Sequence, residues 1–280
     1  MSSAPTVPAP PPELILEAGR AEAHYWRDLW RYRELFFFLT WRELLVRYKQ
    51  TAVGIAWAVL QPALTTVAFC AFGYLLKLPT HGVPRPLLIF AAQLPWSFFA
   101  SSLAASSNSL IGNSHLVSKV YFPRLIVPIS AAAVSLVDFL ISAAMLAILM
   151  AFYRVAPDGR ILALPLFIFI ACGAAIGGGL WLTALHVKYR DVRFVVPFIL
   201  QFGLYVSPVA FSSDVVPERW RTLYALNPMV TVIDGFRWAI CGTAAVYWPG
   251  LLLSLGVTAL LLVTGVTYFR RMERTFADVI

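Results

Sequence analysis

Six long apolar stretches constrain the fold of this chain more than any other feature of its sequence. They run at about residues 52–76, 86–110, 126–152, 161–185, 194–211 and 249–269. Each is close to the ~20 residues that a helix needs to cross a ~30 Å hydrocarbon core. We therefore predict an all-α polytopic membrane protein in which residues 51–272 form six transmembrane helices.

The basic residues between these stretches alternate between crowded and sparse connections. The N-terminal segment, the second and fourth connections and the C-terminal tail together hold 15 of the 22 Lys and Arg residues. Because basic residues near helix ends remain cytoplasmic, both termini are expected in the cytoplasm. A composition of 60% apolar and 13% charged residues excludes an ordinary soluble domain. The net charge of +8 fits attraction to anionic lipid headgroups, and no nucleic-acid partner is expected.

The segment before the first apolar stretch has the pattern of a helix that lies in the membrane interface. Residues 25–50 carry an aromatic stripe with basic residues beside it, and this interface helix includes Trp26, Trp30, Phe37, Trp41, Arg42, Arg47 and Lys49. Thr40 and Glu43 form a capping-box pattern, which predicts a break into two helices near Thr40. The alternative is a helix that packs on a soluble partner domain. Residues 1–24 are predicted to be a disordered cytoplasmic tail, and residues 273–280 a short cytoplasmic C-terminus.

The fifth connection, residues 212–248, is too long and too apolar for a simple solvated loop. Asn227 followed by Pro228 predicts the start of a helix that continues to about Cys241 and dips into the outer leaflet. A further short external helix is expected at Pro217 to Leu226. Asp234 and Arg237 are three residues apart and could form an ion pair.

No catalytic or nucleotide-binding motif is present in the sequence. It contains no Gly-x-x-x-x-Gly-Lys-Ser/Thr loop for nucleotide phosphates and no zinc or nucleophile signature. Cys70, Cys172 and Cys241 lack metal-ligand spacing, so they are interpreted as small buried hydrophobic residues and no metal site is expected. The four histidines are interpreted as surface groups. The chain is therefore predicted to be non-catalytic, with no cofactor of its own.

Polar residues inside the apolar stretches indicate a polar path across the membrane. The candidate path residues are Gln61, Thr65, Gln93, Trp96, Ser97, Ser101, Asn108, Phe198, Gln201 and Tyr205. The alternative interpretation for each is interhelical hydrogen bonding. Asp138 is the only carboxylate deep within a stretch, and a structural hydrogen-bonding role is favoured over a role in transport. Small residues from Gly173 to Gly179 predict close helix packing, either within the chain or with a second copy.

Three motifs resemble the permease subunits of ABC-type polysaccharide exporters, especially the O-antigen (Wzm-like) group and its capsule and teichoic-acid relatives. The first comprises Leu44-Leu-Val-Arg-Tyr-Lys-Gln-Thr51, Gly54-Ile-Ala-Trp57 and Leu60-Gln-Pro62. The second is Asn113-Ser-His-Leu-Val-Ser-Lys-Val-Tyr-Phe-Pro-Arg124, followed by Val137-Asp-Phe139. The third comprises Leu226-Asn-Pro-Met-Val and Val232-Ile-Asp-Gly-Phe-Arg237. The similarity covers residues 25–275, and the order and spacing of the motifs make it specific.

This resemblance implies a homodimer in the bacterial inner membrane that exports lipid-linked polysaccharide with two copies of a separate ATPase, which would bind ATP and Mg. It also implies that two cytoplasmic segments contact the ATPase, with Asn113, Ser114, His115, Leu116 and Lys119 in the first and Tyr189, Arg190, Asp191 and Arg193 in the second. Since the chain ends soon after its last apolar stretch, any carbohydrate-binding domain is expected on a partner. An ion-coupled transporter and a membrane-embedded transferase are alternatives, but each requires further charged groups within the membrane or at one of its faces.

Overall fold

The computed structural model describes residues 21–49, 55–80, 82–243, 246–273 and 276. In this part of the chain every regular element is helical, which confirms the predicted all-α fold. The elements are α1 Ala21–Arg31, α2 Arg33–Lys49, α3 Ile55–Leu75, α4 Arg85–Gly112, α5 Ser114–Lys119, α6 Ile126–Phe152, η1 Gly159–Ala163, α7 Leu164–Lys188, α8 Val192–Val206, η2 Ser213–Val215, α9 Glu218–Tyr224, α10 Pro228–Cys241 and α11 Trp248–Glu273.

Five of the described helices are long and apolar enough to cross a membrane, namely α3, α4, α6, α7 and α11. The sixth predicted span is shorter than expected. Its helix, α8, has 15 residues and ends at Val206 rather than at residue 211. Residues 207–209, beyond its end, are buried against the bundle without being helical. The boundary at residue 211 was therefore wrong, because an apolar composition does not distinguish a helix from a buried irregular segment.

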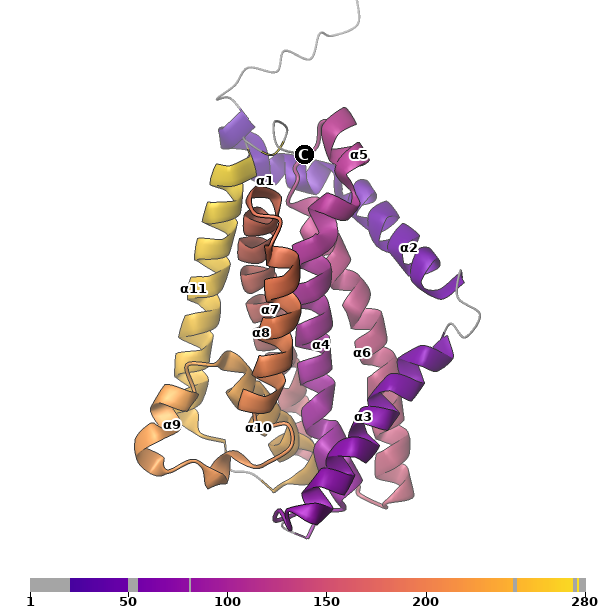
Figure 1. Cartoon of the computed structure of the whole chain (residues 1–280), viewed down its shortest axis with the longest axis vertical. Helices are drawn as coiled ribbons and strands as arrows, with labels where there is room; N and C mark the ends of the chain where they lie inside the picture. The colour runs from indigo at the N-terminus through magenta and orange to yellow at the C-terminus, as the bar shows by residue number, and fades with distance from the viewer. Residues whose placement is uncertain (1–20, 50–54, 81, 244–245, 274–275, 277–280) are drawn as a thin grey trace, which may run out of the picture.

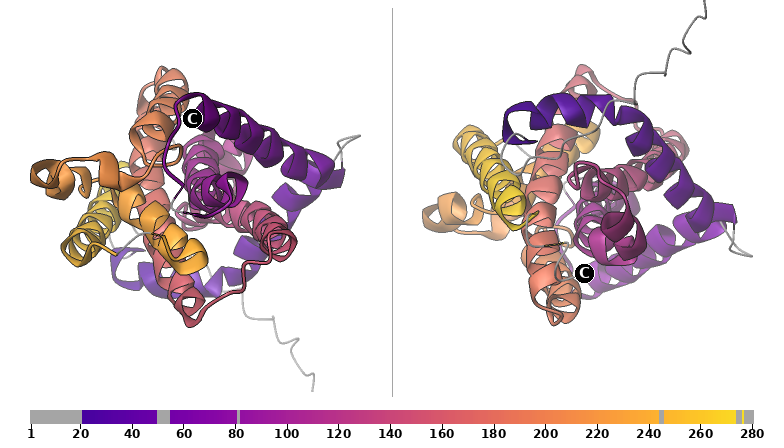
Figure 2. Two further views of the ribbon diagram at one scale, coloured as in Figure 1. Left: turned by 90° about the horizontal axis from the view of Figure 1, so that it is seen from below. Right: turned by 90° about the horizontal axis from the view of Figure 1, so that it is seen from above.

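Helix α4 lies at the centre of the bundle and packs against α3, α6, α7, α8 and α10 (Figures 1 and 2). Most of its residues are buried, including Leu87, Phe90 and Leu94. They join residues from α6, α7 and α10 in one hydrophobic core. This arrangement leaves only a narrow stripe of α4 exposed.

The small residues of α7 pack within the chain, so the structure accounts for their spacing. A Cβ atom added at Gly177 would lie 2.6 Å from the backbone of Leu261, and one added at Gly265 would lie 2.4 Å from the carbonyl oxygen of Gly177. Helices α7 and α11 therefore meet backbone to backbone. Gly179 instead lies against a side chain of α4, since a Cβ atom added there would lie 2.7 Å from the Ser106 hydroxyl oxygen.

The N-terminal helices form a bent arm at the end of the bundle that also carries α5 (Figure 1). The chain bends at Tyr32, between α1 and α2, and not at Thr40. The capping-box prediction was wrong because the Thr40 hydroxyl donates a 2.9 Å hydrogen bond to the Phe36 carbonyl, which is an intrahelical contact. Helix α1 begins at Ala21, four residues before the predicted start. Residues 1–20 and 277–280, which include most of the two predicted tails, lie outside the described residues.

Candidate functional site

Eight of the ten predicted path residues lie on accessible parts of α3, α4 and α8. Helices α3 and α8 flank α4 on the front of the molecule in Figure 1, and the views along the bundle agree (Figure 2). We call this surface the conduit face and define it by the exposed or partly exposed side chains of Gln61, Thr65, Ser97, Ser101, Asn108, Phe198, Gln201 and Tyr205. On α4 the exposed stripe follows helical spacing, since Ser97, Ser101 and Asn108 are four and seven residues apart.

Aromatic side chains on α8 give the conduit face an apolar surface beside its amides and hydroxyls. Phe198 is 68% exposed and Tyr205 is 64% exposed. The ring of Phe198 is stacked with that of Phe202, with 6.2 Å between centroids and 11° between planes. This arrangement can bind sugars, because aromatic faces pack against the apolar faces of sugar rings while amides and hydroxyls hydrogen-bond to sugar hydroxyls.

Gln93 and Trp96 do not belong to this exposed face, since they are only 4% and 6% exposed. The Gln93 side chain accepts a 2.9 Å hydrogen bond from the Thr66 hydroxyl and donates a 3.3 Å bond to the Pro62 carbonyl. The indole of Trp96 packs against Gly203, where an added Cβ would lie 2.7 Å from the ring. Gln93 thus forms the interhelical hydrogen bonds of the alternative interpretation, between α4 and α3, whereas Trp96 packs α4 against α8.

Both segments predicted to contact an ATPase lie at the same end of the bundle (Figure 1). The first forms α5 after a bend at Asn113, with His115 and Lys119 exposed and Ser114 and Leu116 partly buried. The second comprises the turn between α7 and α8 and the start of α8, and its residues Tyr189, Arg190, Asp191 and Arg193 are all exposed. We call this end the coupling end. Its exposed charges suit a water-soluble partner.

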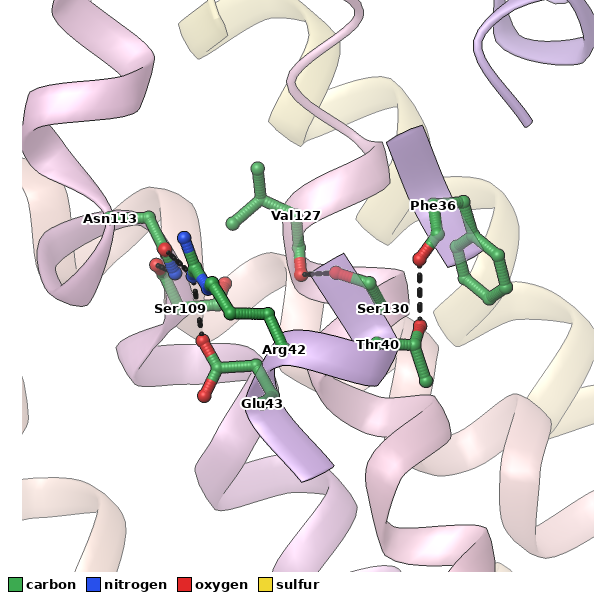
Figure 3. Close-up of polar contacts among 8 residues, drawn as sticks. All are labelled: Phe36, Thr40, Arg42, Glu43, Ser109, Asn113, Val127 and Ser130. Atoms are coloured by element: carbon green, nitrogen blue, oxygen red, sulfur yellow. Dashed lines mark hydrogen bonds and ion pairs between the residues drawn. The ribbon is translucent and has the colours of Figure 1, made fainter. Parts of the chain in front are cut away.

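Arg42 connects the N-terminal arm to the first of these segments (Figure 3). Its guanidinium donates a hydrogen bond to the side-chain oxygen of Asn113 and forms a 3.0 Å ion pair with Glu43. The Asn113 amide donates in turn to the Ser109 carbonyl at 2.9 Å. Asn113 therefore connects α2, α4 and α5. The amphipathic pattern of the N-terminal segment placed Arg42 on the polar side of the helix. It gave no indication that Asn113 is its partner.

Asp138 accepts hydrogen bonds from two residues of α2, Arg47 and Tyr48. Burial, together with the neighbouring carboxylate, raises the pKa of the Tyr48 phenol above its ordinary value, so this group remains protonated and donates. Asp138 has the structural hydrogen-bonding environment that its sequence position led us to expect. The sequence did not reveal these partners of Asp138, because they come from the N-terminal arm and not from another predicted membrane span.

At the opposite end, helix α10 starts as the sequence predicts. The side chain of Asn227 accepts a 3.1 Å hydrogen bond from the Met229 amide, and the helix ends at Gly242, which has a φ of 68°. Gly235 faces Phe167 of α7 so closely that an added Cβ would lie 2.2 Å from its ring. The glycine in the Asp-Gly-Phe-Arg motif thus permits close packing of α10 on α7.

Arg237 is 2% exposed, and its guanidinium is committed to backbone carbonyls. It donates to Val209 at 2.9 Å, to Phe211 at 2.5 Å and to Leu88 at 3.4 Å. The bonds to Val209 and Phe211 satisfy backbone carbonyls of the irregular segment beyond α8, and non-helical backbone at membrane depth requires such partners. Burial raises the pKa of Asp234 to about 6, although Ser213 and Arg237 act to lower it. Arg237 thus influences the charge of Asp234, but its described hydrogen bonds go elsewhere.

His186 corrects the expectation that the histidines are surface groups. It is 5% exposed, and its Nδ1 atom lies 3.1 Å from the Ser107 carbonyl oxygen. The residue lies in the last turn of α7, a largely apolar helix, and packs it against α4. His115 is exposed as expected, whereas the side chains of His24 and His81 lie outside the described residues.

The helical bundle and its long apolar helices define a polytopic membrane protein. A model of the ABC-2 type transporter family matches residues 34–241, which is most of the chain. The chain therefore belongs to the ABC-2 type transporter family of membrane permeases.

Curated relatives within this family are similar over most of their length. The O-antigen export system permease protein RfbA of Klebsiella pneumoniae is 26% identical over 252 residues, covering 88% of this chain and 95% of that protein. A protein of the same name from Myxococcus xanthus is 27% identical over 215 residues, covering 75% of this chain and 82% of that protein. The polysialic acid transport protein KpsM of Escherichia coli is 23% identical over 209 residues, covering 71% of this chain and 78% of that protein.

Proposed function

We propose that this chain is the permease subunit of an ATP-driven exporter that moves a lipid-linked polysaccharide, an O-antigen, out across the bacterial inner membrane. The observation that carries this proposal is the similarity to O-antigen export permeases over 88% of the chain. The conduit face supports it, since exposed aromatic rings beside amides and hydroxyls match the chemistry of a sugar polymer.

The functional assembly is a homodimer in which the conduit faces of two protomers enclose the path. Accessible apolar residues such as Phe194 and Phe202 accompany the polar ones on α8, at 64% and 60% exposed. A second copy would cover these residues and leave the polar stripe of α4 facing the path.

Two copies of a separate ATPase bind the coupling ends from the cytoplasm, so both termini are cytoplasmic. The permease itself is non-catalytic, and ATP and Mg are bound by the partner. When the ATPase copies close, they displace α5 and the turn at residues 189–193. Asn113 and Arg42 pass this displacement to α2, and the contacts of α2 with α6 and of α6 with α3 carry it to the edge of the conduit face. The coupling arises from differential contacts with the partner in its two states.

The proposal is tested by surface display of O-antigen in cells that lack their own exporter and express this chain with its ATPase. Wild type should restore display, whereas an ATPase unable to hydrolyse ATP should abolish it. Gln201→Leu with Tyr205→Ala should reduce display severalfold. The control Leu252→Ala changes a side chain on α11 that is 70% exposed and should have no effect. Display that persists with the inactive ATPase would refute the proposed mechanism.

Capsular polysaccharide is a second candidate cargo, favoured by the similarity to KpsM. The two candidates are distinguished by expressing the same permease and ATPase in hosts that synthesise only one polymer. Export of capsule but not of O-antigen would assign the capsular function.

A further inference from the structure

A pocket of about 590 Å³ opens at the coupling end, between α1, the end of α11 and the segment that leads into α6. Helix α1 crosses the side of the molecule opposite α3 and α8 (Figure 2). The pocket is therefore separate from the conduit face, and the function proposed above does not use it. Its volume is within the range of sites that bind small molecules and headgroups.

Hydrogen bonds involving Glu273 and Arg124 hold the walls of this pocket together. The Glu273 carboxylate accepts a 3.1 Å hydrogen bond from the Tyr25 hydroxyl and a 2.8 Å bond from the Arg124 backbone amide. One guanidinium nitrogen of Arg124 donates to the Glu273 carbonyl oxygen at 2.6 Å. Burial and the Glu273 carboxylate raise the pKa of the Tyr25 phenol far above its usual value, which keeps it a donor. These two charged residues thus serve to join three segments.

Arg270 and Arg271 also line the pocket, and neither forms an ion pair with any residue that the structure describes. The guanidinium of Arg270 lies 4.5 Å from the centre of the Tyr25 ring, while Arg271 is exposed. The remaining carboxylate in the lining is that of Asp28. The lining thus holds three guanidiniums, of Arg124, Arg270 and Arg271, and only two carboxylates, of Asp28 and Glu273, which leaves an excess positive charge.

We propose that this pocket binds the phosphate of an anionic phospholipid headgroup, with Arg270 and Arg271 as its ligands. The planar donor fork of arginine matches phosphate oxygens, and basic pockets between membrane helices at the cytoplasmic face are suited to anionic headgroups. Val120 and Tyr121, which are 51% and 56% exposed in the lining, provide an apolar surface for the glycerol and the start of the acyl chains. A bound lipid would bridge α1 and α11 and so hold the N-terminal arm in place. Only the assignment to the cytoplasmic leaflet rests on the function proposed above.

The test measures lipid binding to the full-length protein purified in detergent, by native mass spectrometry and by the thermal shift on adding lipid. Phosphatidylglycerol should bind more tightly than phosphatidylcholine or phosphatidylethanolamine. Arg270→Gln with Arg271→Gln should weaken this binding about tenfold or more, given the usual contribution of each basic residue near an anionic surface. The matched control, Arg27→Gln with Arg31→Gln, removes the same charge from exposed positions of α1 outside the pocket and should change affinity less than about twofold.

Three results would overturn the proposal. Equal loss of binding in both double variants would indicate general surface charge, and equal affinity for phosphatidylethanolamine would remove the requirement for an anionic lipid. Stabilisation by inorganic phosphate as large as that by phosphatidylglycerol would assign the pocket to free phosphate. Arg270→Lys with Arg271→Lys retains the charge and should keep most of the affinity, which separates loss of the site from loss of the fold.

Discussion

Arg42 of α2 hydrogen-bonds to the side chain of Asn113, which lies where α4 ends and α5 begins. This contact joins the N-terminal arm directly to a segment that is proposed to receive the ATPase. Arg42→Ala should therefore reduce polymer export severalfold while changing thermal stability little, because the Arg42 side chain is 38% exposed. The measurement is surface display of polymer together with a melting curve in detergent. Arg31→Ala, on the exposed side of α1, is the control and should export normally. Normal export by Arg42→Ala would show that this contact does not transmit motion.

The hydrogen bonds to Asp138 should be measurable as a coupling between α2 and α6. Asp138→Ala leaves the donors of Arg47 and Tyr48 without this acceptor and should lower the free energy of unfolding by about 1–3 kcal/mol. Arg47→Ala should have a similar effect. The double variant should lose less than the sum, by about 1 kcal/mol, since both changes remove the same contact. Additive effects in chemical unfolding would contradict the observed pairing.

Gly235 should not accept a methyl group, because Phe167 fills the space that a Cβ atom would occupy. Gly235→Ala is expected to destabilise the protein by about 1–3 kcal/mol through overpacking. Phe167→Leu in the same background should recover part of this loss, which would identify the ring as the obstacle. Gly256→Ala is the matched control, since no atom lies within 4 Å of an added Cβ there. It should be neutral or slightly stabilising in thermal unfolding.

Arg237 should be indispensable for the irregular segment after α8. Arg237→Met keeps much of the side-chain volume but removes the hydrogen bonds to Val209, Phe211 and Leu88, and it should cost about 3 kcal/mol or more. Protease digestion would locate the damage, with faster cleavage expected at residues 207–212 than elsewhere. Arg219→Met on α9 is a control at a position that is exposed at the same end. Uniform protection of residues 207–212 in the Arg237 variant would contradict this role.

The raised pKa of Asp234 predicts a specific dependence of stability on pH. Because the folded protein holds this proton up to about pH 6 and the unfolded chain releases it near pH 4, stability should fall as pH rises between these values. The expected loss is on the order of 1–3 kcal/mol, since a difference of one in pKa between the folded and unfolded states corresponds to about 1.4 kcal/mol. Asp234→Asn should remove this part of the pH dependence in thermal unfolding from pH 4 to 7. An unchanged profile would place the titration on another group.

The sequence predicted the long membrane helices well, because the lipid environment requires their residues to be apolar. Helices α3, α4, α6, α7 and α11 follow the apolar stretches, because lipid-facing and buried positions in a membrane are both apolar. The start of α10 was predicted by a local rule, since Asn227 and Pro228 act within one turn of helix. The end of α8 was not, because residues 208–211 are apolar and the irregular backbone there depends on Arg237, which lies far along the chain.

The candidate site was predicted only in part, for a related reason. Helical periodicity placed Gln93 and Ser97 on one side of α4, but it could not show that α3 covers Gln93 and leaves Ser97 exposed. The bond from Arg42 to Asn113 joins residues that are 71 positions apart, so no pattern within either segment reveals it. Contacts of this kind depend on tertiary packing, which periodicity does not encode.

The shortness of α8 has a consequence for the surrounding bilayer. Its 15 residues extend about 22 Å, roughly 8 Å less than a typical hydrocarbon core. Where α8 borders lipid outside the proposed dimer contact, the bilayer must become thinner to avoid exposing polar groups, at a cost that grows with acyl-chain length. Transport activity should therefore decline in vesicles of longer-chain lipids, which makes membrane thickness a determinant of how well this permease works.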